Sequence, residues 1–141
     1  MKPVEFLRLA EHLAAGNTEA EWRSAVSRAY YGAFHEAQLL LERCGVQLRS
    51  GMESHLKVAY CLQNSTDKAV ARAGTKLAAL RRVRNDADYQ LITARFDALL
   101  AIAQVVDCKE IAQTFRAADP AIVRVGMREY ARDILRLIVS N

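Results

Sequence analysis

The chain has 141 residues, of which 52% are hydrophobic, so it is long enough to bury a core and too apolar to be disordered. Its net charge of +4, from 20 Lys and Arg against 16 Asp and Glu, permits contact with nucleic acid but does not by itself indicate it. No apolar run is long enough to span a membrane and no signal-peptide pattern opens the chain, so we expect a cytoplasmic protein.

Helix-forming residues dominate the composition, with only six Gly and two Pro, and predict an all-α fold. We expect a single-domain antiparallel bundle of about five to six helices. Pro3 suits the first turn of a first helix, which Gly16-Asn17 ends. Thr18 and Glu21 have the spacing of a capping box, which opens a second helix that runs to about Arg43. Turn and cap signals then predict helices over about 52–63 and 68–87, one that begins at 93, and a last one from 119.

The 3–4 spacing of apolar residues predicts which side chains each helix buries. In chain order these are Phe6, Leu9, Ala10 and Leu13; Trp22, Val26, Ala29, Tyr31, Ala33, Phe34, Ala37, Leu40 and Leu41; Met52, Leu56, Ala59 and Tyr60; Val70, Ala73, Leu77 and Leu80; Phe96, Leu99, Leu100, Ala103 and Val106; and Val123, Met127, Tyr130, Ile134, Leu137 and Ile138. The small residues of the second helix, among them Gly32, would let another helix approach it closely. No segment alternates as a strand of useful length would.

A charged residue interrupts the apolar face of the fourth helix. Arg84 occupies the seam that Leu77, Leu80, Ala87 and Leu91 otherwise line, and a guanidinium there costs free energy unless it is paired or faces a wet cleft. One interpretation is an ion pair with Asp88, four residues on, worth about 0.3 kcal/mol if exposed. The other is a phosphate held by the two-pronged guanidinium.

A polar strip on the second helix also has two interpretations. It comprises Arg28, Tyr31, Gly32 and His35. The strip is either a solvated edge of the bundle or one side of a cleft. The other side of such a cleft would be formed by Arg81, Arg84, Asn85 and Asp88.

Other candidate sites are sparse. The last predicted helix carries Arg124, Arg128, Arg132 and Arg136 at intervals of four, which indicates either a solvated face or a surface for an acidic partner or an RNA backbone. No phosphate-binding loop, hydrolase motif or zinc motif is present, and the three His lack ligand spacing, so we expect neither metal nor cofactor. The three cysteines, at 44, 61 and 108, stand singly, so we expect them to pack in the core of a protein from a reducing compartment.

Three blocks of the sequence together resemble the HEPN family of small helical domains. They are S-R-A-Y-Y-G-A-F-H at 27–35, S-H-L-K at 54–57 and R-N-D-A-D-Y at 84–89, in the family's order, and the resemblance covers about 18–106. Residues 119–141 form an additional C-terminal helix. The resemblance implies a bundle that is usually a homodimer, with the R-N blocks of both chains facing one cleft. Many such proteins look like metal-independent ribonucleases, often toxins neutralised by a minimal nucleotidyltransferase encoded alongside.

The resemblance also implies residue roles. In the family's motif an Arg and a polar residue precede a His by five and four positions, which makes Arg84 and Asn85 candidate catalytic residues. Arg would bind the scissile phosphate while His moves a proton. Here Tyr89 replaces that His, and its ordinary pKa near 10 makes it a poor base at neutral pH. His35 or His55 would supply the imidazole only if the fold brings it beside Arg84.

The sequence therefore predicts a HEPN-like module that binds RNA, a nucleotide or a partner nucleotidyltransferase, in a toxin–antitoxin or defence-type system. Its ribonuclease motif is degenerate, and Arg28, Tyr31, Arg81 and Asp88 are the expected binding residues. The alternative is an active metal-independent endoribonuclease that uses Arg84 and Asn85. A third alternative is a purely structural helical oligomer.

Overall fold

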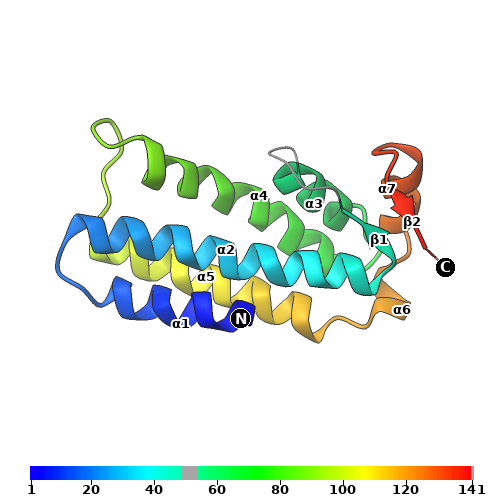
Figure 1. The fold of residues 1–141 in the computed structure, drawn as a ribbon, viewed down its shortest axis with the longest axis horizontal. Helices are drawn as coiled ribbons and strands as arrows, with labels where there is room; N and C mark the ends of the chain where they lie inside the picture. Colours follow the sequence, from blue (N-terminus) through cyan, green and yellow to red (C-terminus); the bar gives the residue numbers. More distant parts are fainter. Residues whose placement is uncertain (49–53, 141) are drawn as a thin grey trace.

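The computed structural model describes residues 1–48 and 54–140, and in those ranges the chain is all α apart from one small antiparallel sheet (Figure 1). The helices are α1 (Pro3–Ala14), α2 (Glu19–Arg43), α3 (Ser54–Gln63), α4 (Lys68–Tyr89), α5 (Ala98–Ala117), α6 (Pro120–Val123) and α7 (Met127–Asp133). The strands are β1 (Val46–Gln47) and β2 (Ile138–Val139). The predicted all-α helical bundle is confirmed. None of the helices in this described part is long and apolar enough to span a membrane.

Helix α2 is the centre of the bundle. It packs against α1, α4 and α5, and Figure 1 shows α1 and α4 running antiparallel to α2, whereas α5 runs in the same direction as α2. The predicted wide apolar arc explains this position, since most of both stripes is buried; Leu40 and Leu41 are fully buried, and Trp22 and Tyr31 partly. Each such leucine contributes about 1.5–3 kcal/mol relative to an exposed one. The helix starts at the predicted capping box: the Thr18 hydroxyl accepts from the Glu21 N–H at 3.2 Å and the Glu21 carboxylate accepts from the Thr18 N–H at 2.9 Å.

Gly32 does not belong to the polar strip in which the sequence placed it. It is buried beneath α1, and a Cβ at this position would lie 2.7 Å from the Leu7 Cγ and 3.3 Å from the Pro3 carbonyl oxygen. Glycine is therefore required for the close approach of α1 to α2. The prediction that small residues admit a neighbouring helix is confirmed at this point.

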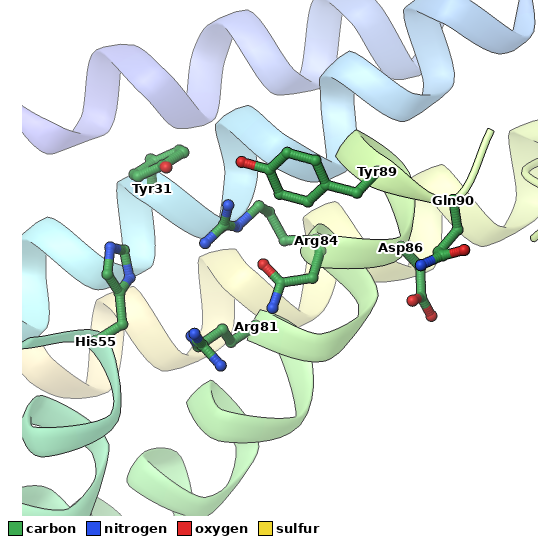
Figure 2. Close-up of a pocket in the computed structure, with 8 residues that line it drawn as sticks. Tyr31, His55, Arg81, Arg84, Asp86, Tyr89 and Gln90 are labelled. Carbon is green, nitrogen blue, oxygen red and sulfur yellow. The ribbon is translucent and has the colours of Figure 1, made fainter. Parts of the chain in front are cut away.

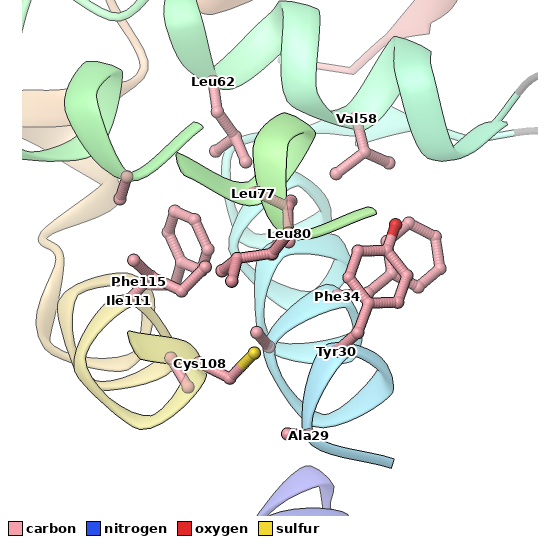
Figure 3. Packing of buried hydrophobic residues seen from close by; sticks show 14 of the residues in the cluster. Ala29, Tyr30, Phe34, Val58, Leu62, Leu77, Leu80, Cys108, Ile111 and Phe115 are labelled. Atoms are coloured by element: carbon pink, nitrogen blue, oxygen red, sulfur yellow. The ribbon is translucent and has the colours of Figure 1, made fainter. Parts of the chain in front are cut away.

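The core lies between α2, α3, α4 and α5. Figure 3 shows Tyr30 and Phe34 of α2, Val58 and Leu62 of α3, Leu77 and Leu80 of α4, and Cys108, Ile111 and Phe115 of α5 packed together. The three cysteines are free and buried, as predicted.

Several predicted helix faces are wrong. In α1 the buried residues are Leu7, Ala10 and Ala14, whereas Leu9 is exposed; in α3 Tyr60 is exposed; and Leu91 lies beyond the end of α4 and is also exposed. In each case the predicted buried face is rotated by about one residue, or the helix end is misplaced by about one turn. The spacing of apolar residues alone does not determine either. Met52, the predicted start of the third helix, lies outside the described residues.

The fifth helix begins at Ala98 rather than at 93, because the Asp97 carboxylate accepts the Leu100 N–H at 2.8 Å and caps it. Its buried face is accordingly Ala101, Val105, Cys108, Ile111, Ala112 and Phe115. The predicted inward positions Leu99, Ala103 and Val106 face solvent, and Leu99 is 79% exposed. Phe96 is buried as predicted, but from the loop that precedes the helix.

The last predicted helix is broken. Gly126 has a φ of 82°, a conformation that favours glycine, and separates α6 from α7. The chain then leaves the helix at Ile134 and pairs β2 with β1, so Ile134 and Ile138 are exposed rather than buried. The predicted arginine stripe is not continuous along one helix, because Arg124 follows α6, Arg128 and Arg132 lie on α7, and Arg136 lies beyond it.

Candidate functional site

A cleft of about 440 Å³ opens where α2, α3 and the C-terminal half of α4 meet. It is lined by Tyr31, His55, Arg81, Arg84, Asn85, Asp86, Tyr89 and Gln90. Figure 2 shows Tyr31 and His55 facing the Arg84 guanidinium, with the Tyr89 ring extending across toward Tyr31. The fold thus brings together six of the residues that the sequence singled out, from three separate segments.

Arg84 is buried in the seam of α4, as its spacing predicted, with 7% of its surface exposed. Its guanidinium carbon lies 5.2 Å from the Tyr30 ring centre and 5.3 Å from that of Tyr31. The only ion pair it forms with a described residue is a long one, 3.5 Å from Nη1 to the Asp88 Oδ2. The Nε atom is buried and has no hydrogen-bond partner within the described ranges. A buried N–H without an acceptor costs free energy, so Arg84 carries an unsatisfied hydrogen-bond donor in this structure.

Arg81 shares this property. It lies one turn before Arg84 on α4, and its Nε is likewise buried without a partner in the part of the chain that the structure describes. Two guanidiniums three residues apart repel each other on a helix face. Their common orientation toward the cleft therefore makes it a concentrated site of positive charge.

His55 faces these arginines from the first turn of α3. Its ring stacks on Phe34 with centres 4.1 Å apart, and its Nδ1 is 2.8 Å from the Tyr30 hydroxyl. Burial and then the charges of Arg84 and Arg81 lower the pKa of His55 to about 4, and burial also raises the pKa of Tyr30. At neutral pH the imidazole is therefore uncharged and the phenol protonated, so the pair shares a neutral hydrogen bond.

Asp88 and Arg28 border the cleft without lining it. The Ser27 hydroxyl donates to the Asp88 Oδ2 at 3.2 Å and thereby ties α2 to α4. The Arg28 guanidinium lies over Tyr31, 5.2 Å from the ring centre, and its Nη2 is 3.4 Å from the Ser27 Oγ. Both residues thus position cleft residues rather than contribute to its surface.

The structure places His35 outside the cleft. It lines a different hollow of about 320 Å³ with Met1, Pro3, Phe6, Gln38, Leu39 and Glu42. Its ring stacks on Phe6 with centres 5.4 Å apart, and its Nδ1 lies 3.1 Å from the Gln38 Oε1. Of the two histidines proposed to supply an imidazole, only His55 shares a cleft with Arg84.

Sequence reasoning missed Arg23, which fixes the end of α4. This buried side chain donates to the carbonyl oxygens of residues 86, 87, 90, 91 and 94, the shortest bond being 2.6 Å to Ala94. Its Nε donates to Glu19 at 2.9 Å and its guanidinium lies 4.7 Å from the Phe96 ring centre. Arg23 therefore satisfies the helix-end carbonyls next to Tyr89. The four-residue spacing of Glu19 and Arg23 is typical of an ion pair on a helix, but nothing in the local sequence indicates that Arg23 also bonds to carbonyl groups more than 60 residues away.

Within the described ranges, no group of three or more His, Cys, Asp or Glu side chains is arranged to hold a metal ion. No protein-family model, no curated protein and no solved structure matches this chain.

Proposed function

We propose that this protein is a HEPN-like module that binds the phosphate groups of RNA or of a nucleotide in the cleft of α4. The observation that carries the proposal is that Arg81 and Arg84 both line one open cleft, and that the buried Nε–H of each lacks an acceptor in the described structure. Guanidinium groups bind phosphate through parallel hydrogen bonds, so one phosphate in the cleft can contact both arginines.

The remaining cleft residues suit a nucleic-acid ligand. Tyr89 is 72% exposed at the rim and Tyr31 lies opposite, so aromatic faces are available for bases; stacking contributes about 1–3 kcal/mol per base. Asn85 offers both a donor and an acceptor. Asp86 adds a carboxylate at the edge, while that of Asp88 is already bonded to Ser27 and Arg84.

The wider setting belongs to the same proposal and is supported by the resemblance to HEPN proteins. We place the module in the cytoplasm, in a toxin–antitoxin or defence-type system, as a homodimer with a minimal nucleotidyltransferase as its partner. A further support for association is the exposed apolar surface beside the cleft, since Leu91 is 69% and Ile92 is 95% exposed.

Binding of a labelled single-stranded RNA, followed by fluorescence anisotropy in EDTA at several salt concentrations, tests the proposal. Arg84→Met should weaken binding and reduce the dependence of log Kd on log salt by about 1, the value for one lost phosphate contact. Arg82→Met is the matched control, because Arg82 is exposed on the same helix outside the cleft. Equal affinities for all three proteins would refute the proposal.

A second candidate function is metal-independent cleavage of RNA, and the position of His55 in the same cleft as Arg84 favours it. The neutral imidazole would accept the proton of the 2′-hydroxyl, whose oxygen bonds to the adjacent phosphorus while the bond to the 5′-oxygen breaks. The 5′-oxygen takes a proton from water, and the resulting hydroxide recovers the proton held by His55. The products are a 2′,3′-cyclic phosphate and a free 5′-hydroxyl. Arg84 would stabilise the charge on the phosphorus oxygens. The anionic phosphate would also raise the low pKa of His55 toward the range of an effective base.

Cleavage of RNA in EDTA distinguishes the two candidates. His55→Ala and Arg84→Met should each abolish cleavage if the enzyme assignment is correct. His12→Ala is the control, since His12 is exposed on α1. Binding without cleavage by the unmodified protein would support the binding module and exclude this enzyme activity on the RNA used.

A further inference from the structure

A second basic pocket lies at the end of the bundle where α2, the small sheet and the C-terminal helices meet (Figure 1). It has a volume of about 210 Å³ and is lined by Glu42, Arg43, Cys44, Gly45, Arg124, Arg128 and Ser140. The cleft residue Tyr31 and the pocket residue Arg43 are 12 positions apart on α2, or about 18 Å along the helix axis, so the two sites are separate.

None of the three arginines of this pocket forms an ion pair with a carboxylate among the described residues. Arg43 donates to the Phe115 carbonyl oxygen at 2.9 Å, and Arg128 donates to that of Ser140 at 2.6 Å. Arg124 forms no side-chain hydrogen bond or ion pair with any residue in the described ranges. Glu42 is the one carboxylate among the described lining residues, so three positive charges against one negative leave two positive.

The buried thiol of Cys44 shows that these charges converge. Burial raises the pKa of Cys44, and the three arginines are the groups that oppose the rise, so all of them act on one sulfur atom. The segments that follow α2 and α7 are joined by the pairing of β1 with β2 and by the bond from the Ser140 N–H to the Gly45 carbonyl oxygen, 2.8 Å long. The arginines therefore lie on a connected framework formed by the end of α2 and the C-terminal segment.

The lining also limits the ligand. The described lining residues include no aromatic side chain and no large apolar one, so a base or a hydrophobic group finds no surface to stack on. A single arginine is enough to neutralise a carboxylate. The two excess positive charges of this pocket would neutralise a doubly charged anion. The remaining donors of several arginines suit the oxygens of a tetrahedral group.

We propose that this pocket is a second anion site that binds one doubly charged phosphate, either free inorganic phosphate or the terminal phosphate of an oligonucleotide. It is independent of the cleft of α4 and of the function proposed for that cleft. It also assigns a role to two arginines of the predicted C-terminal stripe, Arg124 and Arg128, while Arg132 pairs with its neighbour Asp133 at 2.8 Å.

Titration of the isotope-labelled protein with inorganic phosphate, at constant ionic strength and followed by NMR, tests this site. Phosphate should shift the backbone amides of Gly45 and Arg124, and Arg124→Gln should weaken the binding roughly tenfold or more through loss of charged hydrogen bonds. Because Arg124 makes no internal side-chain bond, the variant keeps the fold. Arg132→Ala is the control and should bind as the unmodified protein does.

Each outcome of the phosphate titration either supports or overturns the second anion site. Absence of these shifts, equal shifts with acetate, or unchanged affinity in Arg124→Gln would each overturn the proposal. Retention of the shifts in Arg84→Met would establish that the site does not depend on the cleft, and their loss would overturn it. Competition by an oligonucleotide that carries a 5′-phosphate, but not by its 5′-hydroxyl form, would support a nucleic-acid terminus as ligand. Binding of inorganic phosphate without such competition would support the free anion.

Discussion

Arg23 and Arg84 are buried to a similar degree, 8% and 7% exposed, yet we predict a large loss of stability for Arg23→Met and little change for Arg84→Met. Arg23 donates to five carbonyl oxygens and to Glu19, and its loss leaves helix-end carbonyls without donors. Breaking so well-bonded a buried charge costs about 3–5 kcal/mol. We therefore expect Arg23→Met to lower the free energy of unfolding by about that amount.

Replacement of Arg84 should cost far less. The partly exposed ion pair with Asp88 contributes at most about 1 kcal/mol, and each contact with Tyr30 and Tyr31 about 0.5–1 kcal/mol. Against this, removing a buried Nε–H that has no acceptor recovers about 1–3 kcal/mol. The terms nearly cancel, so we expect Arg84→Met to change the free energy of unfolding by no more than about 1 kcal/mol while it weakens RNA binding.

Urea unfolding of both variants, with the slope m checked for constancy, measures these differences. If Arg84→Met loses as much stability as Arg23→Met, then Arg84 is a structural residue and the cleft is not built around an unsatisfied guanidinium. If instead Arg84→Met changes stability little or increases it while it weakens RNA binding, then Arg84 serves binding rather than stability.

Three further predictions concern His55, Gly32 and Tyr89. Burial lowers the pKa of His55 from 6.5 to about 4, so between these pH values the unfolded chain binds a proton that the folded chain does not. The free energy of unfolding should therefore be highest above pH 6.5 and fall as the pH drops toward 4. The urea midpoints of His55→Gln should lack this pH dependence. Gly32→Ala should lower the free energy of unfolding by about 1–3 kcal/mol, because its Cβ meets Leu7 at 2.7 Å; an unchanged thermal midpoint would contradict the close packing of α1. Tyr89→Ala should leave stability unchanged but weaken RNA binding by about 1–3 kcal/mol, because the exposed ring would stack on a base. An unaltered affinity, measured by fluorescence anisotropy, would show that Tyr89 does not stack on the RNA.

The sequence predicted the central helix and the position of Arg84 well because both depend on local periodicity. In α2 the apolar arc is so wide that small errors of rotation change little, and in α4 the seam is marked by Leu77 and Leu80. The faces of α1 and α5 were predicted less well. Their boundaries depend on single caps such as Asp97, which shift the start by several residues and leave the apolar spacing ambiguous.

Long-range contacts account for what could not be predicted at the site. The bond between Tyr30 and His55 joins residues 25 positions apart, and Arg23 reaches carbonyl groups 63 to 71 positions away. Backbone acceptors carry no residue-type signal, so no pattern in the sequence points to them. In the C-terminal segment the conformation of Gly126 divides a regular helical pattern into two short helices, and the chain leaves the second at Ile134 to form β2.

We propose that a phosphate in the cleft supplies acceptors to Arg81 and Arg84, whose Nε–H groups have none within the described ranges. Nitrogen-15 NMR of arginine side chains tests it directly, during titration with a dinucleotide in EDTA. We predict that the Nε–H resonances of Arg81 and Arg84 shift together as hydrogen bonds form, while that of Arg23, already bonded to Glu19, does not move. Saturable binding of the dinucleotide with both cleft resonances unmoved would contradict the account.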